Sequence, residues 1–86
     1  MSFVVYPNPA NEKVNINITN DAINSDYIMT AEVYSLMGQK LISQEVTFGN
    51  NEINTAHLAN GTYIYSILFH DQSLKTGQLI VNTLSK

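Results

Sequence analysis

Few side chains of this sequence could perform chemistry, and none lies at the spacing of a common catalytic or metal site. The two histidines, His57 and His70, stand thirteen positions apart, and the chain has no cysteine to complete a zinc site. No serine lies in a G-x-S-x-G nucleophile elbow, and no two carboxylates are placed for acid–base work on a sugar. The sequence therefore predicts no catalytic residue, no metal site and no cofactor, and we expect a protein that is not an enzyme.

One oxygen-rich segment, Asn20–Asp26, offers side chains that calcium accepts as ligands. It lacks the D-x-[DN]-x-[DN]-G order of an EF-hand loop. Because Asn, Asp and Ser are also the usual residues of plain turns, a turn without an ion is the preferred interpretation. The sequence leaves open whether this loop binds calcium.

The composition indicates one small domain with little charge. The chain has 86 residues, four lysines, no arginine and a formal net charge of −3. Nucleic-acid binding needs a clustered basic face, which four scattered lysines do not provide. No apolar run reaches the roughly 18–20 residues that cross a bilayer. We expect residues 1–86 to form a single domain, either a very small autonomous protein or a module cut from a longer one, with no nucleic-acid partner and no membrane span.

Alternation of apolar and polar residues dominates the chain, as where Val14, Ile16 and Ile18 alternate with asparagines. About seven strands are expected, over Phe3–Tyr6, Val14–Thr19, Tyr27–Leu36, Lys40–Thr47, Glu52–Thr55, Tyr63–Phe69 and Leu74–Asn82. Turns or loops are expected at Met37–Gln39, Gly49–Asn51, Ala56–Thr62 and Asp71–Ser73. This pattern predicts an all-β fold, a small immunoglobulin-like β-sandwich of about seven antiparallel strands.

The stretch Tyr63–Phe69 is apolar on both faces, because Ile64 and Leu68 alternate with the aromatic residues. Such a strand is expected in the middle of a sheet, and a two-layer sandwich can bury only one of its faces. Two interpretations follow for the other face. Loops and long side chains cover it in part, which we prefer, or Ile64, Leu68 and Tyr34 form an exposed apolar patch for a partner.

The first of three specific segments is Y-P-N-P-A near the N-terminus. It comprises Tyr6, Pro7, Asn8, Pro9 and Ala10. Two prolines around the asparagine fix φ twice and favour extended neighbours, so this segment is no central strand. We expect a stiff lead into the domain, with the tyrosine free to pack inward.

The other two segments are a hairpin around Gly38 and a loop with the spacing L-x-x-G-x-Y. Glycine at the hairpin supplies a positive φ without steric cost. In the loop, Leu58 is expected to plug the end of the core and Gly61 to adopt an angle that a side chain forbids. Tyr63 is expected to turn its hydroxyl back to the loop backbone, as in a tyrosine corner.

Together and in this order, the three segments resemble the type A C-terminal sorting domain of the type IX (Por) secretion system. That family opens with Y-P-N-P-A, matched by Tyr6–Ala10, and continues with a hairpin like Val33–Leu41. Its I-[DN]-[LT]-x-x-L-x-x-G-x-Y segment is matched by Ile53–Tyr63. Its closing lysine and apolar strand resemble Lys75 and Leu79–Val81, so the resemblance covers nearly the whole chain.

The resemblance implies an address tag that directs an N-terminal cargo protein across the outer membrane, to the cell surface or the medium. In the family, a type IX secretion machine reads the domain and a sortase-like protease removes it at the surface. The candidate recognition residues lie in and after the last strand: Lys75, Leu79, Ile80, Val81 and Lys86. If the last strand lies at a sheet edge, its free backbone groups offer strand addition to a partner.

A second interpretation is an accessory module of a secreted surface enzyme, either a carbohydrate-binding module or a spacer. Sugar-binding modules usually expose aromatic side chains on one face, and this chain has no tryptophan. Weak self-association through edge strands or an apolar face is a further expectation.

Overall fold

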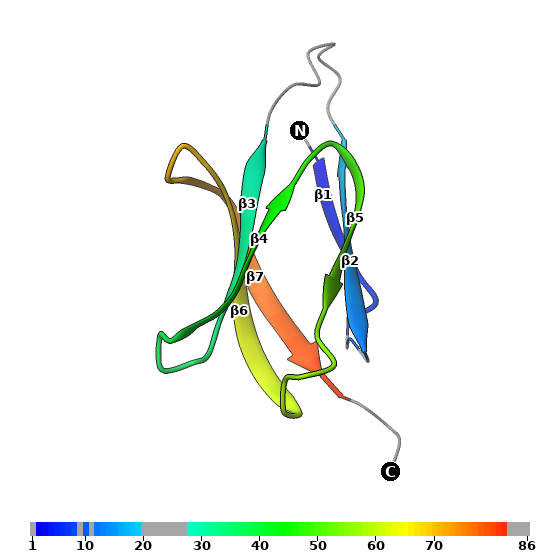
Figure 1. Cartoon of the computed structure of the whole chain (residues 1–86), viewed down its shortest axis with the longest axis vertical. Coiled ribbons are helices and arrows are strands. Elements are labelled where there is room, and N and C mark those ends of the chain that lie inside the picture. The colour runs from blue at the N-terminus through cyan, green and yellow to red at the C-terminus, as the bar shows by residue number, and fades with distance from the viewer. Residues whose placement is uncertain (1, 9, 11, 20–27, 83–86) are drawn as a thin grey trace.

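The alternating residues form two facing β-sheets in the computed structural model of the chain (Figure 1). The structure describes residues 2–8, 10, 12–19 and 28–82. Its strands are β1 Ser2–Tyr6, β2 Lys13–Thr19, β3 Met29–Tyr34, β4 Lys40–Val46, β5 Gly49–Asn54, β6 Gly61–Phe69 and β7 Gln72–Val81. Across those ranges no helix has the length and apolar character that crossing a membrane requires.

One sheet has the strand order β1-β2-β5 and the other the order β4-β3-β6-β7, with every neighbouring pair antiparallel. Strands two and five thus pair in one layer, and strands three and six in the other, as in immunoglobulin-like sandwiches. The fourth strand joins the sheet of the last two. The predicted all-β sandwich of seven antiparallel strands is confirmed.

The core lies between the sheets and is built from the inward row of each strand. Val14, Ile16 and Ile18 of β2 are all buried, as the alternation predicted. They face the inward rows of β3 and β6, which include Val33 and Ile67. Full burial of each such side chain contributes about 1.5–3 kcal/mol, so these rows fix which face of every strand points inward.

The turn predicted at Gly49–Asn51 is wrong, because these residues are the first of β5 and pair with β2. The chain reverses just before them. The side-chain amide of Asn51 accepts a hydrogen bond from the N–H of Thr47 at 3.1 Å and donates to its carbonyl at 2.8 Å. The turn before β5 is therefore stabilised by the side chain of Asn51, which lies within the strand. The number of turn-forming residues in the sequence does not predict this arrangement.

The last hairpin turns earlier than the predicted Asp71–Ser73. Phe69 pairs with Gln72, so His70 and Asp71 alone form the turn, and both have a positive φ, of 53° and 64°. Two-residue hairpin turns of type I′ need this conformation at both central positions. Aspartate and histidine adopt it more readily than most residues, so the tight turn is accessible without glycine here.

Strand β6 is central, between β3 and β7, as its two apolar faces predicted. On the inward side, Tyr65 lies directly opposite Gly77 of β7. A Cβ atom at Gly77 would come within 2.7–2.8 Å of the tyrosine ring and hydroxyl. The glycine therefore leaves the space that the ring occupies, a close approach that an isolated glycine in a strand often signals.

Candidate recognition surface

The terminal strand β7 is an edge strand, and its candidate recognition residues divide between two environments. Leu79 and Val81 are buried in the core, each 1% exposed. Ile80 between them is 40% exposed, and Lys75 near the hairpin is exposed too. Lys86 lies outside the described residues. The first two side chains therefore hold the strand in place, while the next two are accessible to a partner.

Residues of the Y-P-N-P-A segment lie along the free edge of β7. The side chain of Asn8 donates to the carbonyl of Gln78 and accepts from the N–H of Ile80, both at 3.1 Å. Ala10 is fully buried and donates its N–H to the Ile80 carbonyl at 2.6 Å, and its carbonyl accepts from the N–H of Asn82 at 2.8 Å. The two residues thus add a short parallel pairing to the last strand.

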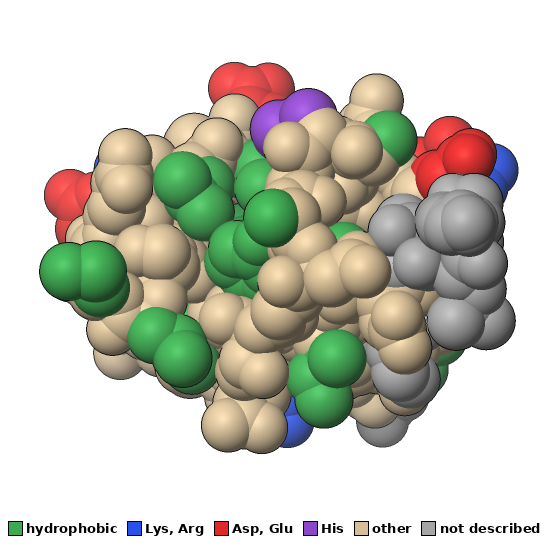
Figure 2. Space-filling view, turned by 90° about the horizontal axis from the view of Figure 1, so that it is seen from below, with side chains coloured by type: hydrophobic (Ala, Val, Ile, Leu, Met, Phe, Trp, Pro, Cys, Tyr) green, Lys and Arg blue, Asp and Glu red, His purple; other side chains and the backbone are tan. Residues whose placement is uncertain are grey.

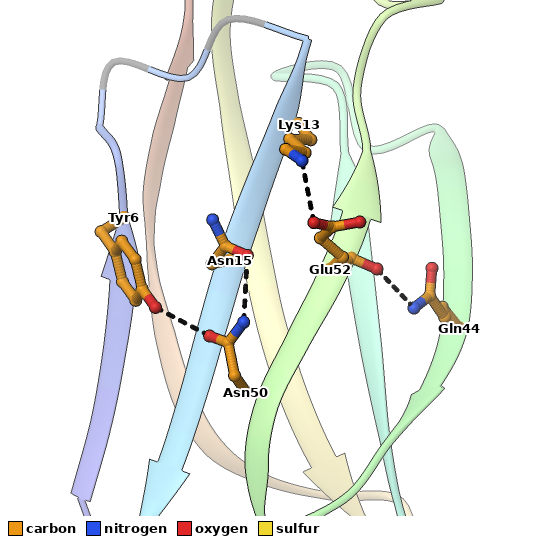
Figure 3. A network of polar contacts seen from close by, with 6 residues as sticks. All are labelled: Tyr6, Lys13, Asn15, Gln44, Asn50 and Glu52. Carbon is orange, nitrogen blue, oxygen red and sulfur yellow. Dashed lines mark hydrogen bonds and ion pairs between the residues drawn. The ribbon is translucent and has the colours of Figure 1, made fainter.

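The inward packing predicted for Tyr6 is wrong. In β1 the inward positions are Phe3 and Val5, so Tyr6 falls in the outward row and is 41% exposed. Its hydroxyl donates to Asn50, whose amide donates to Asn15 (Figure 3). The peptide bond from Tyr6 to the exposed Pro7 is cis, and Pro9 lies outside the described residues.

The outer face of the first sheet is polar around this tyrosine. Figure 3 shows the neighbouring ion pair of Lys13 and Glu52, at 2.9 Å, which raises the pKa of the lysine. The carbonyl of Glu52 accepts from the side chain of Gln44 on β4, at 2.9 Å. A shallow open hollow of about 400 Å³ lies here, lined by Glu12, Lys13, Gln44, Glu52, Asn54 and Ala56.

The hairpin between β3 and β4 follows the sequence prediction. Gly38 has a φ of 94°, a region that side chains rarely allow, and its N–H donates to the Ser35 carbonyl at 2.9 Å. The hydroxyl of Ser35 also accepts from the N–H of Gln39. Leu36 and Met37 at the tip are exposed, the methionine by 96%.

The L-x-x-G-x-Y loop forms the predicted tyrosine corner. The hydroxyl of Tyr63 donates to the carbonyl of Ala59, four residues earlier. Leu58 is buried with the core, and Gly61 has a φ of 156° that a side chain rarely adopts. These three residues fix the end of the sandwich, as expected, and Tyr63 pairs directly with Leu79 of β7.

The outer face of the second sheet is partly covered. Tyr34, Ile64 and Leu68 are all half-buried, which agrees with the preferred interpretation of partial cover. Viewed from the end where β7 finishes, hydrophobic side chains form several separate groups among polar atoms (Figure 2). Next to Tyr34, the Glu32 carboxylate accepts from its hydroxyl and forms an ion pair with Lys40 at 3.0 Å.

This polar cluster shifts the ionisation of its members. The hydrogen bond from Tyr34, and then Lys40, lower the pKa of Glu32 below its ordinary value of 4.5. The same hydrogen bond raises the pKa of the Tyr34 hydroxyl, and the carboxylate raises that of the Lys40 ammonium. The cluster is an ion pair on the outer surface of the sheet.

The residues first considered for chemistry do not converge. His57 lies in the loop before β6, and His70 in the turn after it, against the ring of Phe69 at 4.1 Å between centroids. Within the described part of the chain, no three histidines or carboxylates come close enough to hold a metal ion. The candidate calcium loop Asn20–Asp26 lies outside the described residues.

Sequence reasoning did not anticipate three of these features. It treated Asn8 as part of a rigid turn, although a polar side chain between two prolines is well placed to bond a neighbouring strand. It passed over Gly77, whose position inside an apolar strand was the available signal. It also missed the Glu32–Lys40 pair, which depends on cross-strand register.

Segments near the two ends of the described chain thus meet along one edge of a β-sandwich, at strand β7. A family model described as the secretion system C-terminal sorting domain matches residues 4–82, from within β1 to just past the end of β7. The chain belongs to this family of type IX sorting signals. No curated protein sequence matches it. Membership implies interaction with the type IX secretion machinery and export to the cell surface or the medium.

Proposed function

We propose that the folded domain is read through the exposed side chains of β7, while its buried side chains keep that strand in a fixed position. The observation that supports this is the division of the strand: Leu79 and Val81 are anchored in the core, whereas Lys75 and Ile80 are exposed. A rigid strand with accessible side chains suits recognition by another protein. Cargo attached N-terminally is then carried across the outer membrane.

In this proposal a sortase-like protease at the surface separates the cargo from the domain. The cut lies upstream of Phe3, because cleavage inside the matched range would remove part of the sandwich. The domain itself supplies the address and no catalysis.

The test is a reporter protein fused to the N-terminus of the full chain, with a signal peptide, in a bacterium that has the type IX system. We expect the reporter outside the outer membrane, and in the periplasm when the translocon is deleted. A second fusion lacks residues 83–86, which include Lys86. If this truncated domain stays folded and still exports the reporter, the terminal lysine is not read. If the intact fusion stays in the periplasm of the wild-type strain, the proposal is wrong.

A glycan-binding module is the second candidate, supported by the outer face of the first sheet. There the half-exposed ring of Tyr6 lies beside the amides of Asn15 and Asn50. Aromatic faces beside hydrogen-bonding groups suit sugars. A glycan array with the purified domain tests this, and we expect any binding to be lost in Tyr6→Ala. An array without signal removes this candidate.

A further inference from the structure

The two halves of the free edge of β7 are protected against pairing with another strand in different ways. Among the described strands, β7 pairs only with β6, so every second residue of β7 directs its N–H and C=O away from β6. Such an edge is a template for pairing with another chain unless it is covered or made unsuitable.

The first half of the edge carries its own obstacles to pairing. Strand β7 has a register shift opposite Ile67 and Leu68, which disturbs a regular ladder. Lys75, the single charged residue of the strand, lies in this half, and a lysine at an edge opposes pairing with a like strand. The hydroxyls of Ser73 and Thr76 also bond to each other, at 3.0 Å.

The second half carries none of these. Residues 77–82 have the sequence G-Q-L-I-V-N, with no charge and no proline. Short segments of this composition, rich in β-branched and aliphatic residues, readily pair edge to edge when exposed. Here the half-exposed side chain of Ile80 would add apolar contact to such a pairing.

Asn8 and Ala10, which we call the edge guard, cover this second half. Together they make four hydrogen bonds, to the backbone of Gln78, Ile80 and Asn82. The prolines on either side of Asn8 have no N–H in any conformation, so the guard offers few donors of its own for a further strand. The guard therefore ends the sheet and does not extend it.

We propose that the edge guard keeps this domain from pairing with a second copy of itself through the Gln78–Asn82 edge of β7. The strand that the guard excludes is β7 of a second copy, in antiparallel orientation. Two copies would present the same uncharged segment to each other. Self-association through edge strands was expected from the sequence. At this edge, such pairing requires the guard to open first. This inference stands independently of how the secretion machinery reads the domain.

The test is Asn8→Ala in the full chain, measured by sedimentation velocity over a concentration series. Losing both side-chain bonds raises the population with an open guard roughly tenfold to thirtyfold, since each net hydrogen bond contributes about fivefold. We expect the apparent dimer dissociation constant to fall at least about tenfold relative to wild type, together with faster amide exchange at Ile80. Asn54→Ala, which removes an exposed asparagine of the other sheet that also accepts a backbone hydrogen bond, is the matched control and should stay monomeric.

A second variant identifies the surface. Asn8→Ala combined with Ile80→Lys should return to the monomer, because two lysines would then face each other across the paired edges. If Asn8→Ala does not fold by circular dichroism, Asn8→Asp replaces it, because it loses only the bond to the Gln78 carbonyl, and the dimer dissociation constant should then fall about fivefold. A folded guard variant that stays monomeric overturns the proposal. So does a dimer that the lysine leaves unchanged.

Discussion

The two side-chain rows in the second half of β7 lie in different environments. Gly77, Leu79 and Val81 form the inner row, where a neighbouring ring or the core surrounds each position. Gln78 and Ile80 form the outer row, and both side chains are exposed. A period of two thus separates what the strand needs to fold from what it can present to a partner.

In a sorting signal, one strand can therefore stabilise the fold with some of its side chains and contact a partner with others. Substitutions in the inner row should act on stability, and export should fail because the domain unfolds. Substitutions in the outer row should leave the fold intact and act on recognition alone. The predictions below test that separation.

The largest expected effect comes from Leu79→Ala. Removing a fully buried leucine leaves a cavity and lowers the free energy of unfolding by about 2–5 kcal/mol. The matched outer-row change, Ile80→Ala, should alter stability by less than about 1 kcal/mol, because the side chain already contacts water. Urea denaturation followed by circular dichroism measures both. Equal losses in the two variants would break the distinction between the rows.

Gly77→Ala should act next in size. The added Cβ would meet the Tyr65 ring at 2.7–2.8 Å, so the ring or the strand must move, at about 1–3 kcal/mol. Gln78→Ala, one position along in the outer row, is the control and should be close to neutral. The ring contact predicts that Gly77→Ala is milder in a Tyr65→Leu background. An equal effect in both backgrounds would show that this contact is not the cause.

Tyr63→Phe tests the neighbour that supports the inner row from β6. It removes the hydrogen bond to the Ala59 carbonyl while keeping the ring opposite Leu79. We expect a loss of about 0.5–1.5 kcal/mol, the net value of one such bond. Thermal unfolding should show it, and the native amide spectrum should change only around the loop. If Tyr63→Phe unfolds at the wild-type temperature, the hydrogen bond of the tyrosine corner does not contribute to the free energy of unfolding.

The smallest effect concerns the outer face of the same sheet, at Glu32 on β3. Its pKa is lowered in the folded chain, so its contribution is complete above the ordinary value of 4.5 and is lost as the pH falls through the lower, folded pKa. Glu32→Gln should flatten the decrease in stability below pH 4.5 and leave Lys40 without its partner. Unfolding measured from pH 7 down to pH 3 checks this. An unchanged pH profile would contradict the assignment.

The alternation was enough to predict about seven strands and the inner face of β2, although the start of β5 and the direction of Tyr6 were predicted wrongly. It succeeded because a shift of one residue would expose a whole row, as for Val14, Ile16 and Ile18. The tyrosine corner was also predictable, since its partners lie within a few residues along the chain. Local chemistry and periodicity therefore accounted for the sandwich and for the ends of its core.

The remaining features depend on which strands become neighbours, and no local pattern gives that. The bonds of Asn8 to β7 join residues about 70 positions apart, and the Glu32–Lys40 pair depends on the register of one hairpin. The candidate recognition residues were chosen as one run along the strand. Only the fold divides them, with Leu79 and Val81 inside and Ile80 outside.

The central claim is that a folded sandwich is read through exposed side chains of β7, among them Lys75 and Ile80. The most direct measurement is export of a fused reporter carrying Lys75→Ala and Ile80→Ser, with the folding of the purified variant domain verified by amide spectra. We predict a folded domain whose reporter remains in the periplasm. A folded double variant that exports its reporter as efficiently as wild type would contradict the account.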